Sequence, residues 1–74
     1  MNVFQTSLLS EAAYMNMKNL RIVRSFKGSS GETVFEFEDP SALGEELRIE
    51  YINSDFAKFD DSIRKMRSLI KSNR

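Results

Sequence analysis

The stretch Thr33-Val-Phe-Glu-Phe-Glu-Asp-Pro-Ser-Ala-Leu-Gly-Glu-Glu-Leu47 decides the fold. Its first half alternates apolar and polar side chains, with Phe35 and Phe37 on one face, which is typical of a half-buried β-strand. Its second half predicts a helix, because Asp39 can cap it and Pro40 needs no N–H donor in the first helical turn. The sequence therefore predicts an α+β fold with a strand running into a helix at its centre.

The size and composition of the chain limit its class. Its 74 residues indicate a single domain, residues 1–74, near the lower limit for folding without disulfides or metals. An apolar content of 41% is ordinary for a globular domain and too high for a disordered chain. The sequence has neither cysteine nor histidine, so zinc, haem and imidazole chemistry lose their usual side chains. We therefore expect no metal and no cofactor.

The distribution of apolar residues argues against membranes and secretion. No apolar run reaches the 18 residues of a membrane span. The first six residues, Met-Asn-Val-Phe-Gln-Thr, lack the basic start and apolar core of a secretion signal. We expect a cytoplasmic protein, in the host cytoplasm if a phage encodes it.

The charges balance overall but are unevenly distributed. Residues 1–31 carry +3, residues 32–61 carry −8 and residues 62–74 carry +5. The overall balance argues against strong non-specific binding of nucleic acid, while the basic final segment keeps that function open.

Residues 6–17 are expected to form a helix. Either Thr6 or Ser7 can cap it, and Phe4 is placed to pack back on its first turns. Tyr14 should point away from the core. The expected apolar face consists of Leu8, Leu9, Ala12 and Ala13, with Met15 and Met17 on its borders.

Residues 20–27 and 32–38 predict a two-stranded antiparallel hairpin closed by Gly28-Ser-Ser-Gly31. The expected register pairs Arg21 with Glu38, Val23 with Glu36, Ser25 with Val34 and Lys27 with Glu32. It places on the inner face Leu20, Ile22, Phe26, Phe35 and Phe37, with Arg24 as an exception. Because two strands alone are marginal, helices should cover that face.

The second helix is expected over residues 40–52 and is apolar on two sides. One stripe carries Leu43, Leu47 and Tyr51, and the other patch carries Ala42, Ile49 and Ile52. The second side should contact either another helix of the chain or a second subunit.

A final helix is expected after a break at Asn53, capped by Ser54 or Asp55. Its apolar residues recur at intervals of three, four, three and four, the clearest helical period in the sequence. We expect this stripe to close the core. The expected core cluster is Phe35, Phe37, Leu47, Phe59 and Ile63; the full stripe is Phe56, Phe59, Ile63, Met66 and Ile70.

The acidic residues are the possible catalytic groups. They are Glu36, Glu38, Asp39, Glu45, Glu46, Asp60 and Asp61. Carboxylates do acid–base work when they converge in a cleft that excludes water, and so small a domain has little room for one. We interpret them as solvated surface acids and expect no enzyme. The Gly28–Gly31 loop precedes a strand rather than a helix, so we interpret it as a turn and not a phosphate loop.

The final helix also carries four basic residues on one side, the basic ridge: Arg64, Arg67, Lys71 and Arg74. The ridge could follow the phosphates of a nucleic acid. Alternatively, its cations favour a helix C-terminus and cover apolar edges with their stems. They could also pair with Glu46 and Glu50 of an antiparallel second helix.

Several short motifs together resemble a known family. They are Phe4-x-Thr6 before an Ala-Ala-Tyr14 helix, a hairpin ending Val34-Phe-Glu-Phe-Glu-Asp-Pro40, Tyr51-Ile-Asn53, and Phe59-x-x-x-Ile63-Arg64-x-x-Arg67-Ser-Leu-Ile70. The chain resembles a family of short proteins of unknown function encoded by bacteria, phages and other mobile elements. It departs from the family pattern at Asn16–Asn19, where many members have a Gly, and at Met66-Arg67, where members tend to have Leu-Lys. The resemblance implies a phage or mobile-element origin and assigns no catalytic residue.

We therefore expect a non-enzymatic accessory or regulatory interaction module that acts by protein–protein binding or self-association. The candidate interface consists of Ile49, Ile52, Val23, Val34, Met15 and Met17. A homodimer should use helix contacts, because Glu36 and Glu38 make their strand a poor edge for pairing. The alternative function is nucleic-acid binding through the basic ridge. A basic ridge neutralised by Glu46 and Glu50 would favour the protein partner, and an uninterrupted positive face would favour nucleic acid.

Overall fold

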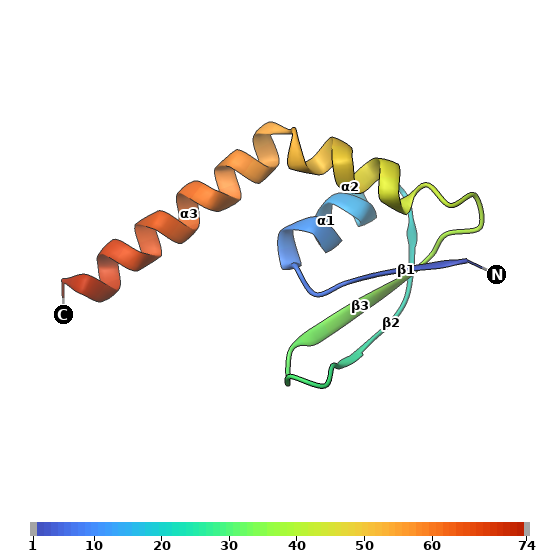
Figure 1. Cartoon of the computed structure of the whole chain (residues 1–74), viewed down its shortest axis with the longest axis horizontal. Helices are drawn as coiled ribbons and strands as arrows, with labels where there is room; N and C mark the ends of the chain where they lie inside the picture. The colour runs from blue at the N-terminus through green and yellow to red at the C-terminus, as the bar shows by residue number, and fades with distance from the viewer. Residues whose placement is uncertain (1, 74) are drawn as a thin grey trace.

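The computed structural model describes residues 2–73, which form three strands and three helices (Figure 1). In chain order these are β1 (Val3–Thr6), α1 (Leu9–Met17), β2 (Arg21–Lys27), β3 (Thr33–Glu38), α2 (Gly44–Ile52) and α3 (Asp55–Ser72). The predicted α+β class is confirmed.

The sheet has three antiparallel strands in the order β1-β3-β2, so the prediction of a two-stranded sheet is wrong. The additional strand is β1, in which Phe4 pairs with Phe37 and Thr6 with Phe35. Four residues are too few for a clear alternation in the sequence. The third strand makes physical sense because it satisfies the second edge of β3 and brings another aromatic ring onto the inner face. β3 is thus the central strand rather than an edge.

A β-bulge at Val23 changes the register of the hairpin. The predicted pairing of Arg21 with Glu38 is confirmed, but beyond the bulge Arg24 pairs with Glu36, so the other predicted pairs are wrong. The remaining observed pairs are Ile22 with Phe37, Ser25 with Phe35, Phe26 with Val34 and Lys27 with Thr33.

This bulge removes the charge that the predicted register left on the inner face. Since directly paired residues point to the same side of a sheet, Arg24 lies on the outer face with Glu36, and Phe26 lies there too, contrary to prediction. The Arg24 guanidinium lies over the Phe26 ring, 4.6 Å from its centre. One extra residue in β2 therefore moves Arg24 off the inner face and places the half-buried Phe26 ring on the outer face.

The core lies between the sheet and the two short helices, α1 and α2, which cover one face of it (Figure 1). Its buried members are Phe4, Ala12, Met15 and Phe37, with Leu20, Phe35 and Leu47 packed against them. The predicted core positions of Phe35, Phe37 and Leu47 are confirmed.

Helix α1 buries a different face from the one predicted. Its buried residues are Glu11, Ala12, Tyr14 and Met15, whereas Leu9 is 74% exposed and Leu8 is also exposed. The helix begins at Leu9 because Thr6 belongs to β1, where its hydroxyl accepts the Leu8 N–H at 3.2 Å. A prediction that considers only apolar residues misplaces the buried face of α1, because it leaves out the buried acid Glu11.

Helix α2 begins four residues later than predicted. Asp39 satisfies the start of the helix as predicted, since its two carboxylate oxygens accept the N–H groups of Leu43 and Gly44, both at 2.8 Å. Its predicted position as the N-cap residue is wrong, because Leu43 is that residue and Pro40 lies before the helix. A turn intervenes, in which Ala42 has a positive φ of 55° and so lies outside the predicted helical patch. Gly44 is required for close packing, because a Cβ there would lie 2.3 Å from the Phe4 ring.

Helix α3 projects away from the rest of the molecule (Figure 1) and has no buried residue between Asp55 and Ser72. Ser54 caps it as predicted, accepting the Ala57 N–H at 3.4 Å. The Cα radius of gyration is 14.1 Å, compared with about 11 Å for a compact chain of this length. The prediction that α3 closes the core is wrong: Phe59 is 67% exposed and Ile63 only half-buried. Strand β1 and the inner faces of α1 and α2 fill that role instead.

Candidate interaction surface

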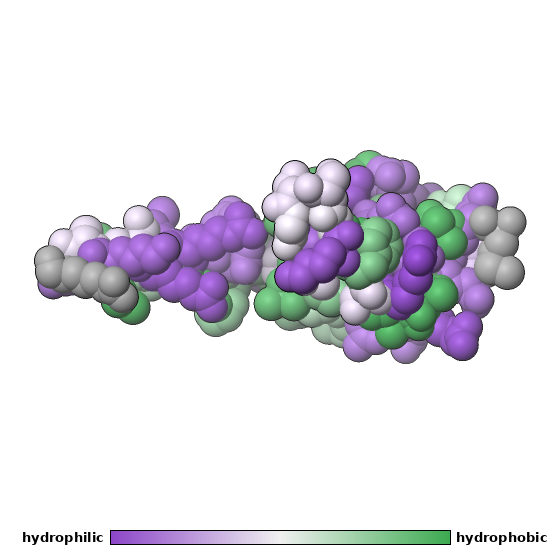
Figure 2. All heavy atoms as spheres, turned by 90° about the horizontal axis from the view of Figure 1, so that it is seen from below, coloured by the Kyte–Doolittle hydropathy of each residue, from purple (hydrophilic) through white to green (hydrophobic). Residues whose placement is uncertain are grey.

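The most prominent surface feature is the apolar side of α3, here called the α3 stripe. It consists of Phe56, Phe59, Ile63, Met66 and Ile70, with Leu69 beside it. All of these except Ile63 are more than half exposed. Figure 2 shows α3 as an arm whose visible face is mostly hydrophilic, with hydrophobic atoms along one edge. So many large apolar side chains on one helix face indicate a binding surface.

The base of the stripe forms one wall of a groove between α1 and α3, the α1–α3 groove. The groove has a volume of about 350 Å³ and a predominantly apolar lining. Its lining residues are Ser10, Ala13, Tyr14, Met17, Phe56, Phe59, Asp60 and Ile63. Asp60 is its one acidic residue, and its carboxylate also pairs with Arg64 at 3.0 Å. The groove and the stripe are continuous through Phe56, Phe59 and Ile63.

Three aromatic rings join α1, α2 and the base of α3. The centre of the Tyr14 ring lies 5.4 Å from that of Tyr51 and 5.8 Å from that of Phe56, and both pairs are tilted. Such offset or tilted geometries are the favourable ones for aromatic pairs. The prediction that Tyr14 points away is therefore wrong, because this side chain holds the base of α3 against α1 and α2.

An ion-pair network on α1 and α2 supports the same junction. The Tyr14 hydroxyl donates to Glu50, and Lys18 Nζ lies 3.0 Å from the same carboxylate. The hydrogen bond from Tyr14 and the one from Lys18 lower the pKa of Glu50 below its ordinary value. Hydrogen bonding to Glu50 and then burial raise the pKa of Tyr14, and Glu50 likewise raises the pKa of Lys18. The Glu50 carboxylate is thus engaged in contacts with Tyr14 and Lys18.

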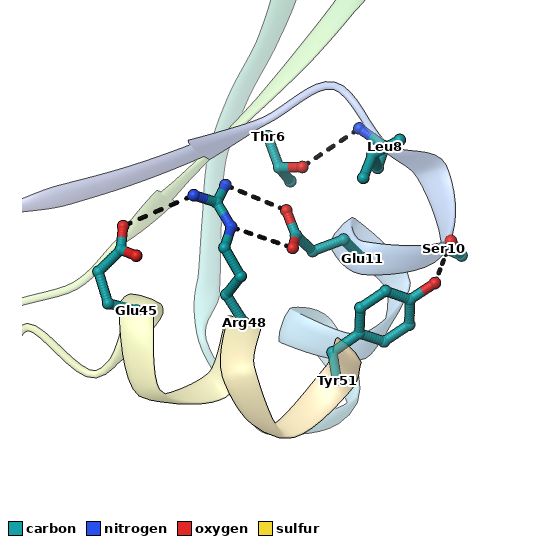
Figure 3. Close-up of polar contacts among 7 residues, drawn as sticks. All are labelled: Thr6, Leu8, Ser10, Glu11, Glu45, Arg48 and Tyr51. Atoms are coloured by element: carbon teal, nitrogen blue, oxygen red, sulfur yellow. Dashed lines mark hydrogen bonds and ion pairs between the residues drawn. The ribbon is translucent and has the colours of Figure 1, made fainter. Parts of the chain in front are cut away.

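A second ion pair joins α1 to α2 (Figure 3). Arg48 Nε and Nη2 donate to the two carboxylate oxygens of Glu11 at 3.1 and 3.2 Å, and Nη1 lies 3.6 Å from Glu45. The hydrogen bond to Glu11 raises the pKa of Arg48. Nearby, the hydroxyl groups of Ser10 and Tyr51 share a hydrogen bond. These contacts hold together α1 and α2, the two helices that cover the core.

The acids at the end of β3 have structural partners, and their interpretation as solvated surface acids is wrong for Glu36 and Asp39, which are buried. Glu36 accepts from Arg24 Nε at 3.2 Å and from Gln5 Nε2 at 2.6 Å, and the pKa of Glu36 is lowered first by Arg24 and then by Gln5. Glu38 pairs with Arg21 at 3.4 Å, and Asp39 caps α2. Within residues 2–73 no group of three or more acidic side chains is arranged to hold a metal ion.

The basic ridge lies along α3, where Arg64, Arg67 and Lys71 are all exposed. Its fourth predicted member, Arg74, lies outside the described residues. The alternative in which the ridge pairs with Glu46 and Glu50 is wrong, since α2 and α3 diverge (Figure 1) and Glu50 pairs with Lys18. Arg64 pairs with Asp60 instead, and Arg67 and Lys71 form no ion pair within residues 2–73.

The other predicted interface residues are spread over the surface. Met15 is fully buried, so its assignment to an interface is wrong; Met17 is exposed and lines the α1–α3 groove. Ile49 and Ile52 are exposed on α2, as expected for a side facing away from the core. On the sheet, Val23 is exposed at the bulge and Val34 is half-buried beside Phe26.

The exposure of Phe56, Phe59, Met66 and Ile70 was not predicted from the sequence, because their helical spacing fits a core stripe equally well. One signal could have distinguished a core stripe from a surface stripe. Once β1 pairs with the sheet, the core is already filled and has little room for the apolar residues of α3.

Comparison of the chain with protein-family models, with curated proteins and with solved structures found no match. No helix within residues 2–73 combines the length and apolar character needed to cross a membrane.

Proposed function

We propose that this chain is a non-enzymatic accessory or regulatory module that binds another protein through the α3 stripe and the α1–α3 groove, self-association included. The sequence resemblance described above supports an origin in a phage or another mobile element. In the proposed mechanism the α+β body is a scaffold and α3 is the recognition element.

The observation that carries this proposal is the exposure of the α3 stripe. Apolar surface in water costs about 25 cal/mol per Å² relative to burial, so an uncovered stripe favours association. An amphipathic helix with apolar residues at intervals of three and four is the form in which helices dock into grooves. Here the helix and a groove lie side by side on one chain.

The structural duties of the acidic residues support the non-enzymatic part of the proposal. Glu36 and Asp39 each use both carboxylate oxygens in hydrogen bonds within the fold, and Glu11 does the same with Arg48. These three carboxylates therefore have partners within the fold, and hydrogen bonds to the charged form favour the ionised state that holds those partners.

A site-specific photo-cross-linker tests the proposed function. A benzophenone amino acid at Met66 in the stripe should form protein adducts in the cell from which the chain comes, and mass spectrometry would identify them. The matched control is the same amino acid at Asp61, five residues before Met66 and on the opposite side of α3. Protein adducts absent at Met66, or equally abundant at both positions, would contradict the proposed function.

A second candidate function is nucleic-acid binding through the basic ridge. The observation that favours it is that Glu46 and Glu50 do not neutralise the ridge, and that Arg67 and Lys71 remain available for phosphates. Binding of this kind would be electrostatic and without sequence preference, since phosphate contacts carry no sequence information. It ranks second because it leaves the α3 stripe unexplained.

A further inference from the structure

We infer that the partner of the α3 stripe is a second copy of this chain, with the two α3 helices packed antiparallel about a two-fold axis. This inference rests on the proposed function and names the partner. It follows from the period of the stripe, the positions of the charges beside it, the groove at its base and the area available.

The spacing of the stripe matches the seam of a two-stranded helical pair. Apolar residues at alternating intervals of three and four residues line one side of each helix and interlock with those of its partner. In an antiparallel pair centred between Arg64 and Lys65, Phe59 meets Ile70 of the second copy, and Ile63 meets Met66 of the second copy. Symmetry repeats both layers, so the seam has four apolar layers.

The charges beside the stripe select this register. Asp60 and Arg67 lie two turns apart on the same flank of the stripe. In the register above, Asp60 of each copy faces Arg67 of the other, giving two opposite-charge pairs at positions that set helix orientation. A shift of one heptad would instead oppose Asp60 with Asp60, or Arg67 with Arg67. A parallel pair would place Asp55 beside Asp60.

The groove provides a place for the projecting end of the partner helix. Only the first half of α3 lies beside α1; the half that carries Met66 and Ile70 extends beyond the body (Figure 1). In the antiparallel pair, this half of each copy lies on Phe59 and Ile63 of the other, at the α1–α3 groove. Met17 on the far wall is then available to the incoming helix. The same patch serves both copies, as a closed two-fold interface requires.

The area involved is sufficient for a dimer. Five large side chains on α3 are more than half exposed. At about 100 Å² of exposed surface each, they provide about 500 Å² per protomer and about 1,000 Å² in all. That total reaches the size at which specific interfaces begin.

A charge-exchange experiment tests the pairing. In sedimentation velocity, Asp60→Arg and Arg67→Asp should each weaken the dimer by about tenfold or more, because each homodimer would contain two like-charge pairs. An equimolar mixture should recover the affinity of the parent, because the mixed dimer contains only opposite-charge pairs. Asp61→Arg, on the opposite side of α3, is the matched control and should leave dimerisation unchanged. A mixture no more associated than its components would overturn the inference.

A second measurement is independent of these charges and uses the absence of cysteine in the chain. When Ile63→Cys and Met66→Cys variants are mixed and oxidised, the antiparallel register predicts mainly the mixed disulfide, measured by mass spectrometry. A parallel pair predicts two homodisulfides instead, and that result would overturn the inference. Circular dichroism of each variant verifies that α3 is intact.

The two proposals fail in different ways. A parent chain that remains monomeric at high micromolar concentration overturns the homodimer. If Met66 then cross-links to a different protein, the proposed function stands with another partner. If the photo-cross-linker at Met66 yields no protein adduct, the proposed function fails as well.

Discussion

Glu11 on α1 and Arg48 on α2 form a two-pronged ion pair, with nitrogen–oxygen distances of 3.1 and 3.2 Å. Glu11 is only 2% exposed, whereas the Arg48 side chain is 36% exposed and also lies over the Phe4 ring. A buried carboxylate is tolerated when both its oxygens are hydrogen-bonded. This pair therefore explains how an acid occupies the buried side of α1.

Replacing Glu11 with Gln should lower the free energy of unfolding by about 1–3 kcal/mol, because Arg48 would lose its charged partner in a partly desolvated site. Urea denaturation measures the change. Glu45→Gln is the control, since the same guanidinium contacts that exposed carboxylate at 3.6 Å, and its effect should be about 0–1 kcal/mol. Equal effects of the two variants would show that Glu11 is not the structural partner.

Two phenylalanines distinguish the core from the interaction surface. Phe37→Ala should cost about 3–5 kcal/mol, since its side chain is fully buried. Phe59→Ala should cost less than about 1 kcal/mol when unfolding is measured at concentrations where the chain is monomeric, because its ring is mostly exposed. A large loss for Phe59→Ala under those conditions would place α3 in the core after all.

The contact between Gly44 and Phe4 predicts a third result. Gly44→Ala should be destabilising by about 1–3 kcal/mol despite the better helix propensity of alanine, since the new Cβ would collide with a core ring. Gly28→Ala is the control: its Cβ would approach only the end of the flexible Glu32 side chain. Thermal melting of both variants checks the prediction, and a stabilised Gly44→Ala protein would contradict it.

The network around Glu50 predicts the pH dependence of stability. Because the pKa of Glu50 is lowered on folding, its contribution is present above the ordinary value of 4.5 and is lost as the pH falls through the folded-state pKa. The pKa of Tyr14 is raised, so its contribution is present below 10.0 and is lost as the pH rises through its folded-state pKa. Glu50→Gln should therefore flatten both the acid and the alkaline limbs of the stability profile.

Spectroscopic titration of tyrosine tests the same contact directly. In the Glu50→Gln variant the pKa of Tyr14 should move back toward 10.0, because both the hydrogen bond to the carboxylate and its charge are removed. Glu46→Gln, on the same helix, is the control and should leave the tyrosine titration unchanged. An unchanged titration in the Glu50→Gln variant would contradict the network.

The salt dependence of binding tests the nucleic-acid alternative. If Arg64, Arg67, Lys71 and Arg74 contact phosphates, the log–log slope of affinity against salt on duplex DNA should be about −3 to −4. Replacing Arg67 and Lys71 with Gln should reduce the magnitude of that slope by about 2 without unfolding α3. No mobility shift at low ionic strength, with single- and double-stranded probes, would exclude this function.

The sequence alone determined the features that depend on neighbouring residues. The alternation around Phe35 and Phe37 predicts a strand, and an acid before a proline predicts the Asp39 cap. The break at Asn53, the cap at Ser54 and the period of the stripe predict α3. Each signal depends on local backbone geometry, which a short segment carries by itself.

Only the tertiary structure decided what those elements cover. The four-residue strand β1 pairs with the free edge of β3. The ion pair with Arg48 allows Glu11 to lie on the buried side of α1. The bulge at Val23 moved Arg24 to the outer face. With the core closed in this way, the α3 stripe was left on the surface. A regular spacing of apolar residues predicts that one face of a helix is covered. Whether the same chain or another protein covers that face depends on contacts between residues far apart in the sequence.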